Sequence, residues 1–134
     1  MNREKTQEDP TLLLVAGRGD RDKKENKLYI QKLSNAILKV VDKHGIARLR
    51  CIGAYSVNNG IKAFIIANQI VKNTEHAKPS EDSETTDNEN LNKELIMDPN
   101  FVNVVLEESE VTGILIEITY EGDWCNEFQW IWIV

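Results

Sequence analysis

The residues best suited to chemistry lie where an apolar segment runs into a polar turn and then into a second apolar segment, across residues 51–71 (CIGAYSVNNGIKAFIIANQIV). Asn58 and Asn59 supply amide donors, and Lys62 follows one helical turn later. The start of a helix leaves backbone N–H groups without internal partners and carries the positive end of the helix dipole. This combination is suited to binding an anion such as phosphate, and Tyr55 is close enough to stack on a base.

A second group of candidate residues lies in the charged segment 17–27 (GRGDRDKKENK), which follows an apolar run. Two glycines give this loop the freedom to follow a phosphate backbone. The cationic candidates in the segment are Arg18, Arg21, Lys23, Lys24 and Lys27. Two plainer interpretations stay open: a solvated loop of mixed charge, and, in the first group, an Asn helix cap with an exposed Lys and a half-buried Tyr.

Length and composition favour one small domain over residues 1–134. With 134 residues, 41% of them hydrophobic, the chain can bury one ordinary core. No apolar run approaches the roughly 20 residues of a membrane span, and the first ten residues are too polar for a secretory signal. We therefore expect no membrane association and a location in the cytoplasm, nucleus or nucleoid. Cys51 and Cys125 are far apart in the sequence, which fits a reducing compartment and opposes a thiolate metal site.

The net charge of −6 hides a strong asymmetry between the two parts of the chain. Residues 1–72 contain 14 Lys and Arg and 7 Asp and Glu (+7), whereas residues 73–134 contain 2 and 15 (−13). Such a distribution predicts an acidic tail or insertion beside a basic surface. The overall pI near 5.0 therefore does not exclude a polyanionic ligand.

Hydrophobic periodicity predicts four strands and two helices. Asn26 is available to cap the first helix, which should begin at Lys27 and end at Gly45. In the second strand, Arg48 and Arg50 should share one side and Leu49 and Cys51 the other. The predicted elements in chain order are strand 11–16, helix 27–45, strand 47–54, helix 57–71, and a hairpin of strands 101–106 and 112–120.

Three segments differ from this pattern. Residues 1–10 are predicted to form a flexible N-terminus, and residues 73–93 a disordered acidic insertion, because they have too few apolar residues to offset the entropy of ordering. Residues 122–134 are predicted to form an aromatic C-terminal strand, because aromatic and apolar residues recur there at every second position. We expect the acidic insertion to lie over the basic face and to compete with phosphate.

The order of elements predicts an α/β fold of the α+β two-layer sandwich type. Two parallel strands joined through a helix require a crossover, so both helices should pack on one face of a mixed sheet. The expected order is βαβαββ.

The segments IGAYSVNNGIKAFIIA (residues 52–67) and ELIMDPNFVNVVLEESEVTGILIEITYE (residues 94–121) resemble the stage V sporulation protein S family, a branch of the Alba-like nucleic-acid-binding superfamily. The resemblance implies the βαβαββ Alba-like fold and assembly into homodimers or higher homo-oligomers. It also implies a binding surface made by the first loop, the turn that opens the second helix, and the hairpin tip. In this chain these parts correspond to residues 17–27, 56–62 and 107–110.

The hairpin tip departs from the Alba pattern. Alba arms that reach along a duplex are basic, whereas this tip contains Glu107, Glu108 and Glu110, which phosphates repel. The departure favours the sporulation branch and opposes a duplex-clasping arm.

These observations lead to one principal hypothesis and one alternative. The first is a non-enzymatic protein that binds DNA or RNA through phosphates with weak sequence specificity, without cofactor or metal. Neither His44 nor His76 has Cys or carboxylate neighbours at ligand spacing, and no nucleophile has a plausible base partner. The alternative is a regulatory or structural oligomerisation module that binds no polynucleotide.

Overall fold

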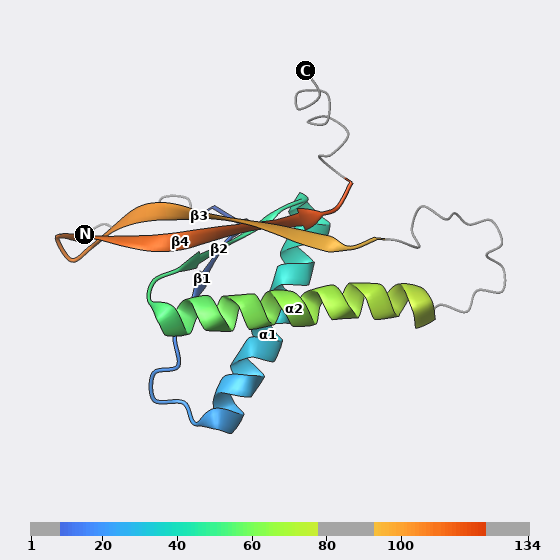
Figure 1. Ribbon diagram of the computed structural model, residues 1–134, viewed down its shortest axis with the longest axis horizontal. Helices are drawn as coiled ribbons and strands as arrows, with labels where there is room; N and C mark the ends of the chain where they lie inside the picture. The colour runs from blue at the N-terminus through green and yellow to red at the C-terminus, as the bar shows by residue number, and fades with distance from the viewer. Residues whose placement is uncertain (1–8, 78–92, 123–134) are drawn as a thin grey trace, which may run out of the picture.

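The computed structural model describes residues 9–77 and 93–122. Within these ranges the chain forms two helices and a four-stranded mixed sheet of order β1-β2-β4-β3, and both helices lie on one face of the sheet (Figure 1). The predicted α+β two-layer fold with βαβαββ order is thereby confirmed. The elements are β1 (Leu12–Val15), α1 (Lys23–His44), β2 (Ala47–Cys51), α2 (Ala54–Ala77), β3 (Leu95–Leu106) and β4 (Ser109–Tyr120).

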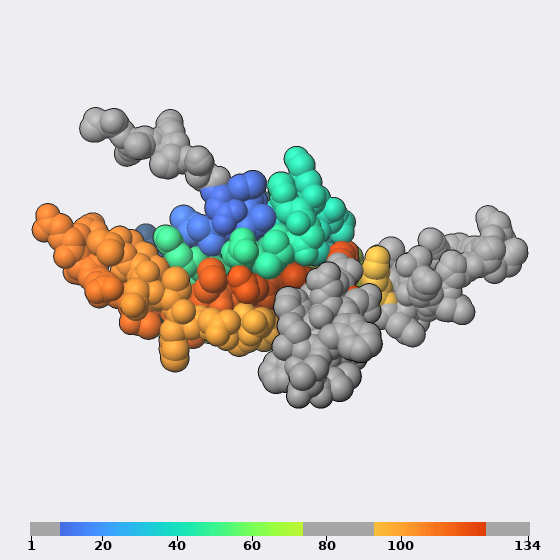
Figure 2. Space-filling model, turned by 90° about the horizontal axis from the view of Figure 1, so that it is seen from above, coloured from blue at the N-terminus to red at the C-terminus, as the bar shows by residue number. Residues whose placement is uncertain are grey.

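The β3–β4 hairpin extends well beyond the rest of the sheet. β2 pairs with β4 only as far as Cys51 opposite Ile114, whereas β3 and β4 continue to pair up to Leu106 opposite Ser109. We call residues 102–113 the arm; Figure 2 shows this end of the hairpin, in orange, extending away from the body of the domain. Because β3 is an edge strand, its residue Pro99 does not interrupt a central ladder.

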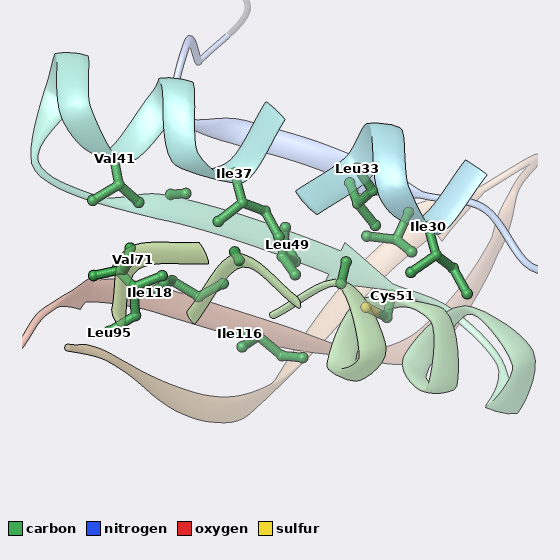
Figure 3. Packing of buried hydrophobic residues seen from close by; sticks show 14 residues of the cluster. Ile30, Leu33, Ile37, Val41, Leu49, Cys51, Val71, Leu95, Ile116 and Ile118 are labelled. Atoms are coloured by element: carbon green, nitrogen blue, oxygen red, sulfur yellow. The ribbon is translucent and has the colours of Figure 1, made fainter. Parts of the chain in front are cut away.

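The core lies between the sheet and the two helices. β2 alternates as predicted: Leu49 and Cys51 are fully buried, while Arg48 and Arg50 lie half-buried on the opposite face. Ile37 of α1 and Ile116 of β4 are also fully buried and belong to the same cluster (Figure 3). The alternation fixes the side of the sheet on which the helices pack, because a shift of one residue would turn the arginines into the core.

Helix α1 begins one turn earlier than the sequence predicted. Its N-cap is Asp22, whose carboxylate accepts a hydrogen bond of 2.8 Å from the backbone N–H of Glu25. The Glu25 carboxylate accepts in return from the backbone N–H of Asp22, at 3.1 Å. This capping box satisfies two backbone donors together, which Asn26 alone cannot do. The predicted end at Gly45 is confirmed by its left-handed φ of 86°.

Helix α2 is longer at both ends than predicted. It starts at Ala54, so strand β2 ends at Cys51, and it continues through Ala77. Residues 73–77, assigned to the disordered insertion on sequence grounds, are therefore helical. The remaining prediction for the insertion falls on residues 78–92, outside the described part of the chain, as do most of the N-terminal prediction (1–10) and of the C-terminal strand (122–134).

Candidate nucleic-acid interface

Among the residues that the structure describes, no side chain caps the start of helix α2. Gly53, with φ of 98°, turns the chain out of β2, and the hydroxyl of Ser56 donates back to the carbonyl oxygens of Ile52 and Gly53. No side chain among the described residues accepts a hydrogen bond from the backbone N–H groups of residues 54–56, and the first turn contains no acid. The positive end of this helix therefore remains available to an anion.

The loop between β1 and α1 is fastened to this helix start by Asn59. The Asn59 side chain is buried, and its amide donates to the carbonyl oxygen of Ala16 (3.1 Å) and to Asn26 Oδ1 (3.2 Å). Asn26 Nδ2 donates in return to Asn59 Oδ1 at 3.1 Å. Gly17 packs so closely on the same turn of α2 that a Cβ there would lie 3.2 Å from Tyr55 Cβ. The two segments that the sequence singled out separately thus form one surface.

Two of the predicted cations hold the loop in shape. Arg21 is partly buried, and its guanidinium donates to the carbonyl oxygen of Gly17 and lies 4.3 Å from the ring centroid of Tyr29. Arg18 is exposed, and its Nε donates to the carbonyl oxygen of Arg21 at 2.9 Å. The phenolic oxygen of Tyr29 accepts from the backbone N–H of Ala16, which fixes the end of β1. Within the described part of the chain this bond of Arg18 uses only Nε, so its terminal nitrogens can still donate to a ligand.

The other predicted residues have exposed side chains. Lys23 and Lys24 are exposed in the first turn of α1, and Lys27 is exposed one turn later. On α2, Asn58 and Lys62 are exposed, and Tyr55 exposes 66% of its surface. The structure therefore divides the predicted site residues into two groups. Arg21 and Asn59 are engaged in internal contacts, whereas the exposed group consists of Arg18, Lys23, Lys24, Lys27, Tyr55, Asn58 and Lys62.

Sequence reasoning missed two residues that build this surface. Asn26 was assigned to a helix cap and Tyr29 to no role, yet they hold Asn59, Arg21 and the end of β1. The only sequence signal for Asn26 is an amide residue within a charged loop, and that signal does not identify a partner 33 positions away.

Other charged groups lie outside this surface. On the opposite face of the sheet, Arg48 donates to Glu117 at 3.0 Å and to the hydroxyl of Thr11 at 2.8 Å. Asp9 lies 3.6 Å from the same guanidinium, and its hydrogen bonds from Thr11 lower the pKa of its carboxyl group. These interactions occupy Arg48 in fastening β1 to β2 and β4.

The described residues offer little for other kinds of chemistry. In residues 9–77 and 93–122, no three His, Cys, Asp or Glu side chains gather as metal ligands. Burial raises the pKa of the Cys51 thiol to about 11, so Cys51 is neutral and unsuited to nucleophilic attack. No helix in these ranges is long and apolar enough to cross a bilayer.

Fold and surface together define a small α+β domain in which a cationic loop and an uncapped helix start adjoin. Residues 25–77, from the first turn of α1 to the end of α2, match the family model described as Stage V sporulation protein S (SpoVS). This match supports the predicted resemblance to the SpoVS family over this part of the chain. A search of curated proteins gives no significant match.

Proposed function

We propose that this protein is a non-enzymatic DNA- or RNA-binding protein whose contacts are mainly to phosphates and only weakly dependent on sequence. The observation that carries the proposal is the joining of the cationic loop to the start of α2 through Asn59 and Asn26. This junction supports simultaneous contact with a phosphate backbone by lysines and by free helix N–H groups, and with a base by the exposed ring of Tyr55.

The proposal makes a quantitative prediction for salt dependence. If Lys23, Lys24, Lys27 and Lys62 each neutralise one phosphate, log Kd should rise with log[salt] with a slope of about 3.6 for duplex DNA. Affinity should then fall by roughly 100-fold between 50 and 200 mM salt. Fluorescence anisotropy with a labelled 20-mer duplex and with single-stranded DNA and RNA measures the slope directly. A flat salt response would exclude phosphate-dominated binding.

A pair of matched variants locates the surface. Lys23→Ala with Lys24→Ala should lower the slope by about 2, because two counterion-releasing contacts are lost. Lys39→Ala with Lys43→Ala removes the same charge from exposed positions at the other end of α1, about 22 Å or more away and beyond the screening length. The control pair should keep the wild-type slope. Equal effects of the two pairs would show that net charge, and not this surface, governs binding.

The acidic insertion can be tested by neutralisation at constant length. Residues 78–92 contain five acids and one lysine. Changing each Glu to Gln and each Asp to Asn should tighten nucleic-acid binding, and the effect should fade above roughly 0.3 M salt as the Debye length shortens. Unchanged affinity at 50 mM salt would exclude competition between the insertion and phosphate.

The alternative, an assembly module that binds no polynucleotide, is favoured by one observation. Phe101 at the base of the arm exposes 82% of its surface, and Val105 within the arm exposes 70%. Exposed apolar residues of this size are typical of a protein-binding surface. An absence of binding to mixed-sequence DNA and RNA at low salt would favour this alternative.

A further inference from the structure

The face of the sheet that is turned away from the two helices carries an apolar patch. In Figure 1 the helices lie below the sheet, and Figure 2 shows the upper face, where β1, β2, β4 and β3 lie side by side. The strand register places Leu14 of β1, Arg50 of β2 and Leu115 of β4 next to one another on this face. Leu14 exposes 60% of its surface, and Leu12 and Leu115 are partly exposed. The aliphatic stem of Arg50 joins the leucines into one surface.

Arg50 lies at the centre of this patch without a recorded partner. The other arginine of β2, Arg48, forms an ion pair of 3.0 Å with Glu117. Arg50 instead lies between Leu14 and Leu115, and no hydrogen bond or ion pair joins it to another residue in the part of the chain that the structure describes. A guanidinium flanked by apolar side chains is well suited to an aromatic ring stacked over it, above all to the indole of tryptophan.

We propose that segment 123–134 docks on this patch of the same molecule, with Trp130 stacked over Arg50. The segment, DWCNEFQWIWIV, contains all three tryptophans of the chain, and aromatic or apolar side chains recur at every second position from Phe128 to Val134. In an extended conformation these side chains share one side, which requires a second apolar surface to cover it. The inference is independent of nucleic-acid binding and of oligomerisation, because it uses neither the cationic loop nor the arm.

The end of β4 directs the segment toward this face. The chain turns at Glu121 and Gly122, where Gly122 has a φ of 99°, and the backbone N–H of Glu121 donates to the carbonyl oxygen of Glu94 at 2.7 Å. Both sides of β4 are already paired, with β2 and with β3, so the segment cannot extend the sheet beside β4. Toward the helices, the hydroxyl of Tyr120 donates to Asp42 of α1 at 2.8 Å, so that side is occupied. The side of β4 that remains is the face with the patch.

Chain length places Trp130 at the level of Arg50. Seven residues of extended chain, or about 23 Å, lead from Leu115 to Gly122. Eight residues, or about 26 Å, lead from Gly122 to Trp130. A segment that reverses at Gly122 and runs back along β4 therefore returns Trp130 to Leu115 within one residue, which the turn itself takes up. Leu115 is the direct neighbour of Arg50 in the sheet, so the indole of Trp130 reaches the guanidinium.

Tryptophan fluorescence of the full chain tests the proposal, because every tryptophan lies in segment 123–134. Native protein should emit at shorter wavelength than the urea-unfolded chain and should resist quenching by acrylamide, since docking removes the indoles from water. Leu14→Ser should shift the emission to longer wavelength and raise the quenching constant.

Leu28→Ser is the matched control. Leu28 is as exposed as Leu14 (57% against 60%), but it lies on α1, on the other side of the sheet. This variant should keep the wild-type emission and quenching, and far-ultraviolet circular dichroism should show native helix content in both variants. A native emission equal to that of the unfolded chain, or equal effects of the two substitutions, would overturn the proposal.

A cross-linking experiment identifies the contact itself. Benzoylphenylalanine in place of Trp130, in a mixture of unlabelled and ¹⁵N-labelled chains, should on illumination react with the peptides that contain Leu14, Arg50 or Leu115. The products should each contain a single isotope, because the contact lies within one molecule. Mixed-isotope products would show that the patch receives the segment of a second copy, and products at α1 or α2 would place the segment on another surface. Either result would contradict the proposed docking.

Discussion

The hydrogen bonds of Asn59 should make this buried residue one of the most sensitive polar positions in the domain. Its side chain takes part in three hydrogen bonds, one to the Ala16 carbonyl and two shared with the amide of Asn26. A typical intramolecular hydrogen bond contributes about 1 kcal/mol, and a buried partner left unsatisfied adds a further cost. Asn59→Ala should therefore lower the free energy of unfolding by about 3 kcal/mol. Asn58→Ala is the neighbouring control; this amide is exposed and should change stability by less than about 0.5 kcal/mol.

A double-mutant cycle separates the network from simple loss of packing. Asn26→Ala removes the same two shared bonds and a long one of 3.4 Å from Arg21, so it should cost about 2 kcal/mol. Because the shared bonds are lost in either single variant, the double variant should be about 1 to 2 kcal/mol more stable than the sum of the singles predicts. Urea unfolding followed by circular dichroism gives all four values. Strict additivity would refute the view that these two amides fasten the loop to α2.

Three further predictions follow from backbone geometry and burial. Glu107 and Glu108 have left-handed φ values of 49° and 71°, which Asn and Gly adopt at lower cost than Glu. Glu107→Asn with Glu108→Gly should therefore raise the free energy of unfolding by about 1 to 2 kcal/mol in urea titrations. An unchanged value would argue against strain in this turn. A Cβ at Gly113 would lie 2.7 Å from the Cys51 carbonyl oxygen, so Gly113→Ala should cost about 1 to 3 kcal/mol, and a neutral effect would contradict the close approach of β4 to β2. In a Cys125→Ser background, Cys51 should react with a thiol reagent at pH 8 only as fast as the protein opens. A rapid reaction of the native protein would contradict the burial of Cys51. Because the pKa of Cys51 is raised from 9.0 to about 11, the thiol's contribution to stability should be complete below pH 9 and should decline toward pH 11.

The sequence predicted the architecture because the apolar periodicities are unambiguous. Leu49 and Cys51 alternate with arginines, and α1 carries its buried residues at steps of three and four, so neither segment has another way to bury its apolar side. The start of α1 was misplaced because Asp22 and Asn26 are both good cap residues. The deciding feature was Glu25, three positions after Asp22, which completes a capping box.

Residue types alone could not show which residues of the candidate site are exposed and which are engaged in internal contacts. Asn58 and Asn59 are adjacent and chemically identical, yet one is exposed and the other is 2% exposed. Their difference arises because the helix turns 100° between them and the long-range partners, Asn26 and Ala16, lie on one side only. Arg21 was likewise expected to be a free cation, and its contact with Tyr29 depends on a loop path that no local pattern specifies.

At Lys23 and Lys24, helix stability and the proposed nucleic-acid binding favour side chains of opposite charge. Both lie in the first turn of α1, where the helix dipole disfavours cations by about 0.3 to 1 kcal/mol each. The capping box of Asp22 and Glu25 offsets part of this cost, but a first turn optimised for stability alone would carry acids instead. Lys23→Glu with Lys24→Glu should therefore raise the free energy of unfolding by about 1 kcal/mol while it abolishes nucleic-acid binding at 150 mM salt. A variant that is more stable and binds as the wild type does would show that the two lysines have no part in the phosphate surface.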